Sequence, residues 1–141
     1  MSLEPGTYKI KNVRSGTFLD LWGGSPDEGT PIQGYEEQSG DNQKWILKWT
    51  GVGNQMTLQN LQGGSYLGAA GSIENGVKAV GNYNAVPLFI VAAERGYGIE
   101  AANDRGYALD LYGGEKANVT PVIFYTSQAN NNQKWYFEKA A

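Results

Sequence analysis

The chain has 141 residues, with no cysteine, no histidine, 20 glycines and a formal net charge of −3. The length suits one domain with its own core. The missing side chains exclude disulfide scaffolds, thiolate or imidazole metal sites, and catalysis by Cys or His, so neither a metal nor another cofactor is expected. The basic residues are scattered singly, which makes nucleic acid an unexpected partner.

The N-terminal residues 1–6 lack the basic and apolar regions of a signal peptide. The longest apolar run, residues 85–93, is interrupted by Pro87 and is too short to span a bilayer. The sequence therefore predicts a leaderless, cytoplasmic chain that inserts into no membrane.

Short strands with a two-residue period are the predicted elements. In chain order they are residues 8–11, 18–21, 45–47, 56–59, 108–111 and 135–137. Residues 23–27, 75–76 and 130–132 have turn compositions. No window has the apolar spacing of a three-turn amphipathic helix, so the sequence predicts an all-β fold.

Internal repetition is the strongest pattern in the sequence. Residues 16–48 align without a gap on residues 106–138, with 14 identities in 33 positions at a constant offset of 90. A middle copy begins where residues 60–67 match residues 12–19, but the match ends at Gly68. The repeats span about residues 7–48, 55–93 and 97–139, and the short segments between them favour one domain, residues 1–141.

The middle copy keeps apolar residues and loses polar ones. Leu67 corresponds to Leu19, and Phe89 is aligned with Trp45. The residues aligned with Asp20, Tyr35 and Gln43 are Gly68, Val80 and Pro87. This contrast predicts two repeats that carry a site and one that serves only the fold. Tyr83, between two asparagines, is the residue on which a different middle site could be built.

Two motifs carry a family resemblance. Gln43-Lys44-Trp45 and Gln133-Lys134-Trp135 resemble the Gln-x-Trp signature of ricin-B-type β-trefoil lectins. The segment of residues 19–24 resembles the sugar-binding turn of that family. The absence of cysteine makes the chain most similar to fungal members such as the Rhizoctonia agglutinin group. The resemblance implies a β-trefoil of three pseudo-symmetric, four-stranded units, in which six strands form a barrel and hairpins cap it.

A pyranose presents a C–H face and a rim of neighbouring hydroxyls, which suit an aromatic ring, a carboxylate and an amide. The resemblance implies a first-repeat site of this kind, with Asp20 accepting hydroxyls, Tyr35 stacking, Asn42 donating and Gln43 holding Asp20. Gly23 would offer its backbone N–H, and Gln33 would add a polar contact. The third-repeat set is Asp110, Gly113, Tyr125, Asn132 and Gln133. Ile123 stands there in place of Gln33.

The predicted function is a lectin for terminal galactose or N-acetylgalactosamine on glycans and glycoproteins. The alternative is a β-trefoil protease inhibitor that acts through exposed loops. A glycoside hydrolase would need two facing carboxylates about 5–10 Å apart. Each predicted site offers one, so no enzyme is expected, and the adjacent Glu36 and Glu37 are interpreted as a solvated edge. The sequence leaves open whether Trp22 and Tyr112 contact a ligand or cover the barrel rim, and whether the chain forms a homodimer.

Overall fold

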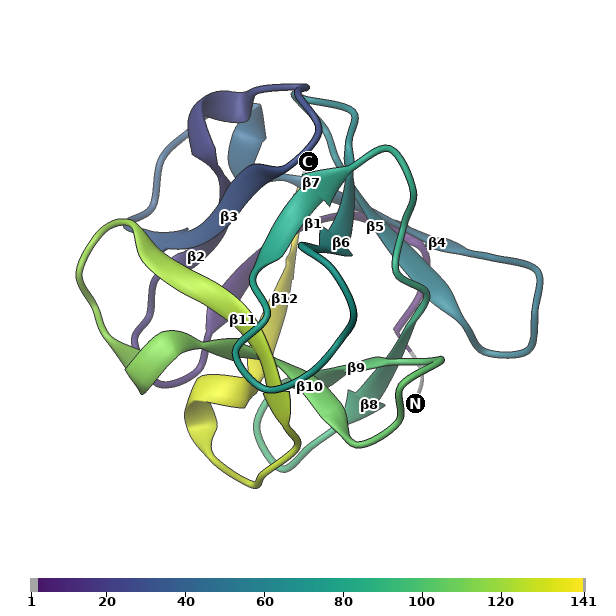
Figure 1. Cartoon of the computed structure of the whole chain (residues 1–141). Coiled ribbons are helices and arrows are strands. Elements are labelled where there is room, and N and C mark those ends of the chain that lie inside the picture. Colours follow the sequence, from purple (N-terminus) through teal and green to yellow (C-terminus); the bar gives the residue numbers. More distant parts are fainter. Residues whose placement is uncertain (1–2, 141) are drawn as a thin grey trace.

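The computed structural model describes residues 3–140 as twelve short strands arranged around a central barrel (Figure 1). The strands are β1 (Gly6–Asn12), β2 (Phe18–Leu21), β3 (Thr30–Tyr35), β4 (Trp45–Trp49), β5 (Met56–Asn60), β6 (Tyr66–Ala69), β7 (Ala79–Asn82), β8 (Leu88–Ala92), β9 (Tyr97–Ala101), β10 (Tyr107–Leu111), β11 (Thr120–Thr126) and β12 (Trp135–Lys139). The helical elements of these residues are single 3₁₀ turns: η1 (Trp22–Gly24), η2 (Asp41–Gln43), η3 (Tyr112–Gly114) and η4 (Asn131–Gln133). Met1, Ser2 and Ala141, which the predicted domain includes, lie outside the described residues.

Six strands close the barrel by antiparallel pairing. β1 pairs with β12 and β4, β5 with β4 and β8, and β9 with β8 and β12. The remaining strands form the hairpins β2–β3, β6–β7 and β10–β11. The hairpins meet through pairs of β3 with β7 and β11 and through a bridge between Lys78 and Ile123. This is a β-trefoil, as the family resemblance implies; the all-β fold that the sequence pattern predicts is confirmed. No helix within residues 3–140 is long and apolar enough to cross a membrane.

Two tryptophans fill the barrel, and their polar atoms tie it to the hairpins. Trp45 and Trp135 are fully buried. Each indole N–H donates to a backbone carbonyl of its own repeat, Trp45 to Leu19 at 3.0 Å and Trp135 to Leu109 at 3.2 Å. Both rings therefore belong to the core.

The middle repeat differs from the predicted alignment by one residue in β8. Trp45 pairs with Tyr8 and Asn60, and Leu88 occupies the corresponding place between Met56 and Ala101. Leu88, not Phe89, is therefore the counterpart of Trp45, and the residue at the Gln43 position is Val86, not Pro87. The alignment was wrong because it followed residue type across a loop whose length differs between repeats.

The β6–β7 hairpin requires a second correction. Gly68 pairs with Val80 as Asp20 pairs with Gln33, so Val80 does not correspond to Tyr35. Asn82 holds that position. Its Nδ2 lies 2.8 Å from the point where a Cβ on Gly68 would stand, and it donates to the Ala69 carbonyl at 3.1 Å. The Asn82 side chain thus lies where a carboxylate on residue 68 would begin.

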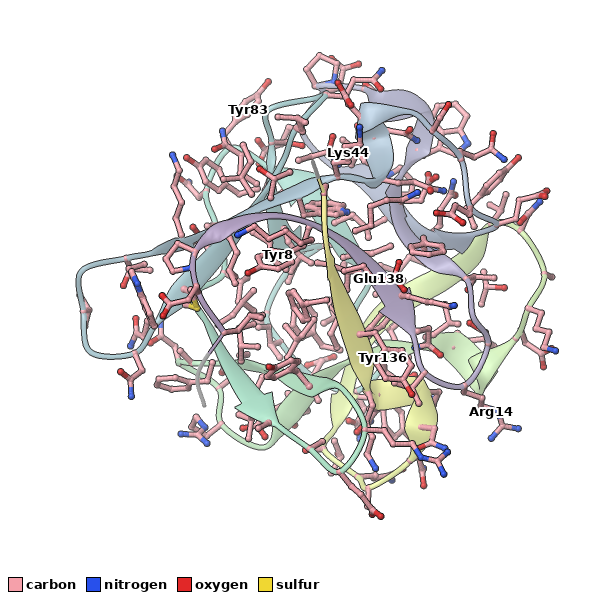
Figure 2. All side chains as sticks on the ribbon, turned by 180° about the vertical axis from the view of Figure 1, so that it is seen from behind. Tyr8, Arg14, Lys44, Tyr83, Tyr136 and Glu138 are labelled. Atoms are coloured by element: carbon pink, nitrogen blue, oxygen red, sulfur yellow. The ribbon has the colours of Figure 1, made fainter. Side chains whose placement is uncertain are left out.

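Tyr83, the next residue, is 69 % exposed and lies at the periphery of the molecule (Figure 2). Its backbone N–H donates to the Glu28 carboxylate at 2.8 Å. Asn82 turns inward over Gly68 while Tyr83 faces solvent, so the structure does not bring the two side chains together as one middle site.

Candidate functional site

A hollow of about 440 Å³ opens beside the β2–β3 hairpin. Five of the six side chains or backbone positions predicted for the first-repeat site line it: Asp20, Gly23, Gln33, Tyr35 and Asn42. The sixth, Gln43, is fully buried behind Asp20. Residues from β2, β3 and the two 3₁₀ turns η1 and η2 are therefore brought together in one depression.

Asp20 forms the floor of this first hollow. It lies on β2 and is only 3 % exposed. Its Oδ1 accepts from Gln33 Nε2 at 3.1 Å, and its Oδ2 accepts from Gln43 Nε2 at 3.0 Å. Each carboxylate oxygen has a further lone-pair direction, so the fixed group can still accept hydrogen bonds from a ligand.

Gln43 is held too firmly to serve as a ligand contact. Its Nε2 also donates to the Glu36 carbonyl at 2.8 Å, and its Oε1 accepts from the Gln38 backbone N–H at 2.9 Å. Every polar atom of this amide is thus engaged within the protein. Gln43 orients Asp20, while Asn42, which donates to the Leu21 carbonyl at 3.2 Å, lines the hollow itself.

A second hollow, of about 510 Å³, lies beside the β10–β11 hairpin. It is lined by Asp110, Gly113, Tyr125 and Asn132 from the predicted third-repeat set. Gln133 is buried and donates to Asp110 Oδ2 at 2.9 Å, as Gln43 does to Asp20. This third-repeat hollow thus reproduces the carboxylate floor of the first.

The two hollows differ in the side chains around the floor carboxylate and in their lining. Ile123 faces Asp110 across β10 and β11, where Gln33 faces Asp20. Asp110 Oδ1 instead accepts from Asn132 Nδ2 at 3.2 Å. The third hollow is also lined by the exposed Glu115. The expectation of one carboxylate per site therefore fits the lining of the first hollow and is wrong for the third.

Burial raises the pKa of both floor carboxyls above their ordinary value of 3.8. For Asp20 the hydrogen bonds from Gln43 and Gln33 oppose this effect, and for Asp110 those from Gln133 and Asn132 do so. Desolvation is the larger influence in both. The site therefore keeps a carboxylate that is short of hydration and open to new hydrogen-bond donors.

Trp22 and Tyr112 follow the ends of β2 and β10 and line the two hollows. They are 56 % and 60 % exposed, which favours contact with a ligand over a role in covering the barrel. The glycines after them, Gly23 and Gly113, have φ angles of 59° and 61°, a conformation that favours glycine. A Cβ on Gly23 would meet no atom within 4 Å, so the space above it is open to a ligand.

Glu36 and Glu37 do not form a carboxylate pair. Glu37 binds Lys9 Nζ at 2.8 Å, whereas Glu36 Oε1 accepts from the Asn118 amide at 2.7 Å. Both glutamates are exposed. Their interpretation as a solvated edge is therefore confirmed.

Buried asparagines from neighbouring repeats support both hollows, and the site prediction did not include them. Asn60 Nδ2 donates to the Asn42 carbonyl at 2.9 Å, and Asn12 Nδ2 donates to the Asn132 carbonyl at 3.0 Å. At the third equivalent position stands Ala101, which has no side-chain amide to donate. The match of Asn12 with Asn60 in the repeat alignment was the available signal.

The chain is similar to known proteins in sequence and in fold. Residues 1–83 match the model of the family described as Ricin-type beta-trefoil lectin domain-like. The crystal structure of the Rhizoctonia solani agglutinin is 56 % identical over 99 % of both chains, with a TM-score of 0.98. A ricin B-like lectin of Macrolepiota procera in complex with lactose is 33 % identical, over 99 % of this chain and 100 % of that one, with a TM-score of 0.88. The designed three-fold symmetric protein ThreeFoil is 26 % identical, over 96 % of this chain and 99 % of its own, with a TM-score of 0.89.

Proposed function

Because the chain belongs to the ricin-type β-trefoil lectin family, we propose that it binds terminal galactose or N-acetylgalactosamine at two sites, the first-repeat and third-repeat hollows. One observation carries this proposal. Each hollow has a buried carboxylate on its floor, held by a fixed glutamine and flanked by two aromatic side chains. The complex of the Macrolepiota procera lectin with lactose, a galactoside, supports the sugar class.

The arrangement suits the chemistry of a galacto-configured sugar. The axial 4-hydroxyl lies close to the 3-hydroxyl, so that one carboxylate can accept from both. The axial group also leaves a continuous C–H patch on the opposite face of the ring. We propose that Tyr35, which lines the first hollow, and Tyr125, which lines the third, cover that patch.

Shallow sites of this kind bind single sugars weakly. A charge-assisted hydrogen bond of about 1.5–3 kcal/mol and neutral ones of about 1 kcal/mol must offset the cost of ordering the ligand. A net near 4 kcal/mol corresponds to a Kd of about 1 mM. Useful avidity then comes from two sites on one chain, and it would increase if the chain formed a homodimer.

Isothermal titration of the protein with lactose tests the proposal. We expect two binding events per chain with Kd values near the millimolar range, together with recognition of galactose-terminated glycans on a glycan array. We expect no release of reducing sugar, because we propose binding without hydrolysis. Failure to bind any galactoside on the array and in the titration would overturn the assignment.

Binding is expected to weaken as the pH falls from neutrality. The raised pKa of Asp20 and Asp110 means that both begin to take up protons above 3.8, and a protonated carboxyl can no longer accept two hydroxyl donors equally. Titrations with lactose at a series of pH values measure this loss. An affinity that stays constant down to pH 3.8 would contradict the role given to the two carboxylates.

The same pKa shift has the opposite effect on stability. Between 3.8 and the raised pKa, the folded state binds more protons than the unfolded state, so the free energy of unfolding falls as the pH rises. Above the raised pKa the carboxylate is ionised in both states, and the folded protein carries the full desolvation cost. Comparison with Asp20→Asn, which cannot titrate, isolates this contribution from those of other groups.

A further inference from the structure

The loops that join the hairpin strands interlock in a cycle around the molecule. Each loop offers a side-chain oxygen that accepts the backbone N–H at the end of a hairpin strand in the next repeat. The pairs are Glu28 with Tyr83 at 2.8 Å, Asn75 with Thr126 at 2.7 Å and Asn118 with Glu36 at 2.8 Å. The loop of the third repeat is thereby fastened beside the site of the first.

The residue after each acceptor has a left-handed backbone. Gly29, Gly76 and Val119 have φ angles of 85°, 90° and 69°, and their N–H groups donate to equivalent carbonyls of the next repeat at 2.8, 2.9 and 3.0 Å. Two of these three related positions are glycine, the residue that this conformation favours. Among the non-glycine residues of the described chain, Val119 alone has a positive φ.

Packing does not explain why a valine stands at position 119. A β-branched residue in this region is strained, and its side chain is 54 % exposed, so it gains little from burial. Its side chain instead lines the first hollow, together with Asp20 and Tyr35. A Cβ added at Gly76, the related position for the third repeat, would have no atom within 4 Å. The side chain of Val119 thus forms an apolar wall of the first hollow. The third hollow has no such wall, because glycine stands at the related position 76.

An unsatisfied, buried acceptor belongs to a residue that lines the same hollow. Gln33 is 4 % exposed, and its Nε2 donates to the Asp20 carboxylate, which fixes the orientation of the amide. Its Oε1 has no hydrogen-bond partner. A buried amide oxygen without a donor is costly, and a ligand N–H or O–H can satisfy it. The third repeat has Ile123 at this position and offers no such acceptor.

We propose that the first-repeat site selects sugars that carry an acetamido group, whose N–H donates to Gln33 Oε1 while its methyl contacts Val119. An acetamido group combines one donor with one methyl, and the first hollow offers a partner for each. A plain hydroxyl could satisfy Gln33 but would leave Val119 without a contact. The third-repeat site, with Ile123 and Gly76, binds the galactose ring without this selection. This inference rests on the proposed lectin function.

Single-site backgrounds allow the test, with titration of the methyl glycosides of galactose and N-acetylgalactosamine. In Asp110→Asn, where only the first site remains, we expect N-acetylgalactosamine to bind about fourfold more tightly than galactose, the gain from burying one methyl group. In Asp20→Asn, where only the third site remains, we expect a ratio near one. In the Asp110→Asn background, Val119→Gly should bring the ratio near one. Gln33→Ile should weaken both sugars together, because an N–H and a hydroxyl can each donate to Gln33.

Two further variants keep the test decisive. Val52→Gly removes another exposed valine, in the loop between β4 and β5, and should leave both affinities unchanged. In the Asp20→Asn background, Gly76→Val combined with Ile123→Gln should transfer the preference to the third site. Thermal unfolding checks that each variant folds, and Val119→Gly should not lower the unfolding temperature, because it relieves strain.

The outcomes separate the two proposals. If the wild type binds neither sugar, the lectin function itself fails. If Asp110→Asn binds both sugars equally, or if Val119→Gly leaves the ratio unchanged, the lectin function stands and the acetamido selection is overturned.

Discussion

Replacement of Asp20 by asparagine is expected to abolish measurable galactoside binding at the first-repeat site, and Asp110→Asn should do the same at the third. A carboxylate accepts from two sugar hydroxyls at once, whereas an asparagine amide has one acceptor and turns a donor toward the second hydroxyl. Each charge-assisted bond contributes about 1.5–3 kcal/mol. Its loss lowers the affinity by about one to two orders of magnitude, which takes a millimolar site beyond detection.

The Asp20→Asn protein should remain folded because the introduced amide can keep both internal hydrogen bonds of the carboxylate. The Gln43 amide is fixed by Glu36 and Gln38, so the oxygen of the new amide must face Gln43 Nε2. The nitrogen of the new amide then faces Gln33, whose amide can turn to present its unpartnered oxygen. Lost binding would therefore report on the site and not on unfolding.

Titration of lactose into the single and double variants measures the effect. Each single variant should show one binding event and the double variant none, with unchanged circular dichroism. Asp104→Asn, which removes an exposed carboxylate in the loop between β9 and β10, is the matched control and should bind as the wild type does. A double variant with the heat and stoichiometry of the wild type would place the sugar elsewhere.

The outer two repeats could be placed from sequence because their offset is constant. Once residues 18–21 and 108–111 are assigned as strands, the same pairing brings Asp20 opposite Gln33 and Asp110 opposite Ile123. Because the two repeats have a fixed spacing, the strands of both pair in the same register. The apolar pattern of one strand alone does not determine that register. This is why most predicted site residues line the two hollows.

The middle repeat lacked that constraint. Its loops differ in length, so residue identity was the remaining guide, and a one-residue slip in β8 exchanged Leu88 for Phe89. Nothing in the sequence indicates that Asn82 folds over Gly68, since the two residues are joined only by β6–β7 pairing. Strand register within a non-identical repeat depends on contacts that local sequence does not encode.

Contributions from one repeat to the site of another were equally hidden. Asn60 fixes the backbone at Asn42, and Val119 lies against the first hollow from the third repeat. Asn60 was marked only by its match with Asn12 in the repeat alignment, and the repeat motifs do not include Val119. Their roles follow from the closure of the trefoil, which places each hairpin loop beside the strand end of the next repeat.

The substitution Trp45→Leu is expected to lower the free energy of unfolding by about 2–4 kcal/mol. Leucine leaves part of the space of the indole ring empty, and the Leu19 carbonyl loses the donor that the indole N–H provides. The middle repeat has leucine at the position equivalent to Trp45, and it supplies another donor to the strand carbonyl. There Leu88 stands in the core, and the backbone N–H of Val86 donates to the Leu67 carbonyl at 3.1 Å.

The first repeat has no such replacement donor, and this decides the direction of the effect. The counterpart of Val86 is Gln43, whose backbone N–H already donates to Gly40 within η2. Urea unfolding of Trp45→Leu and Trp45→Phe separates the two costs, because phenylalanine restores most of the volume but not the hydrogen bond. If Trp45→Phe is as stable as the wild type, the carbonyl of Leu19 needs no donor. If Trp45→Leu loses less than about 1 kcal/mol, the first repeat repacks as the middle one does, and Trp45 is retained for a reason other than stability.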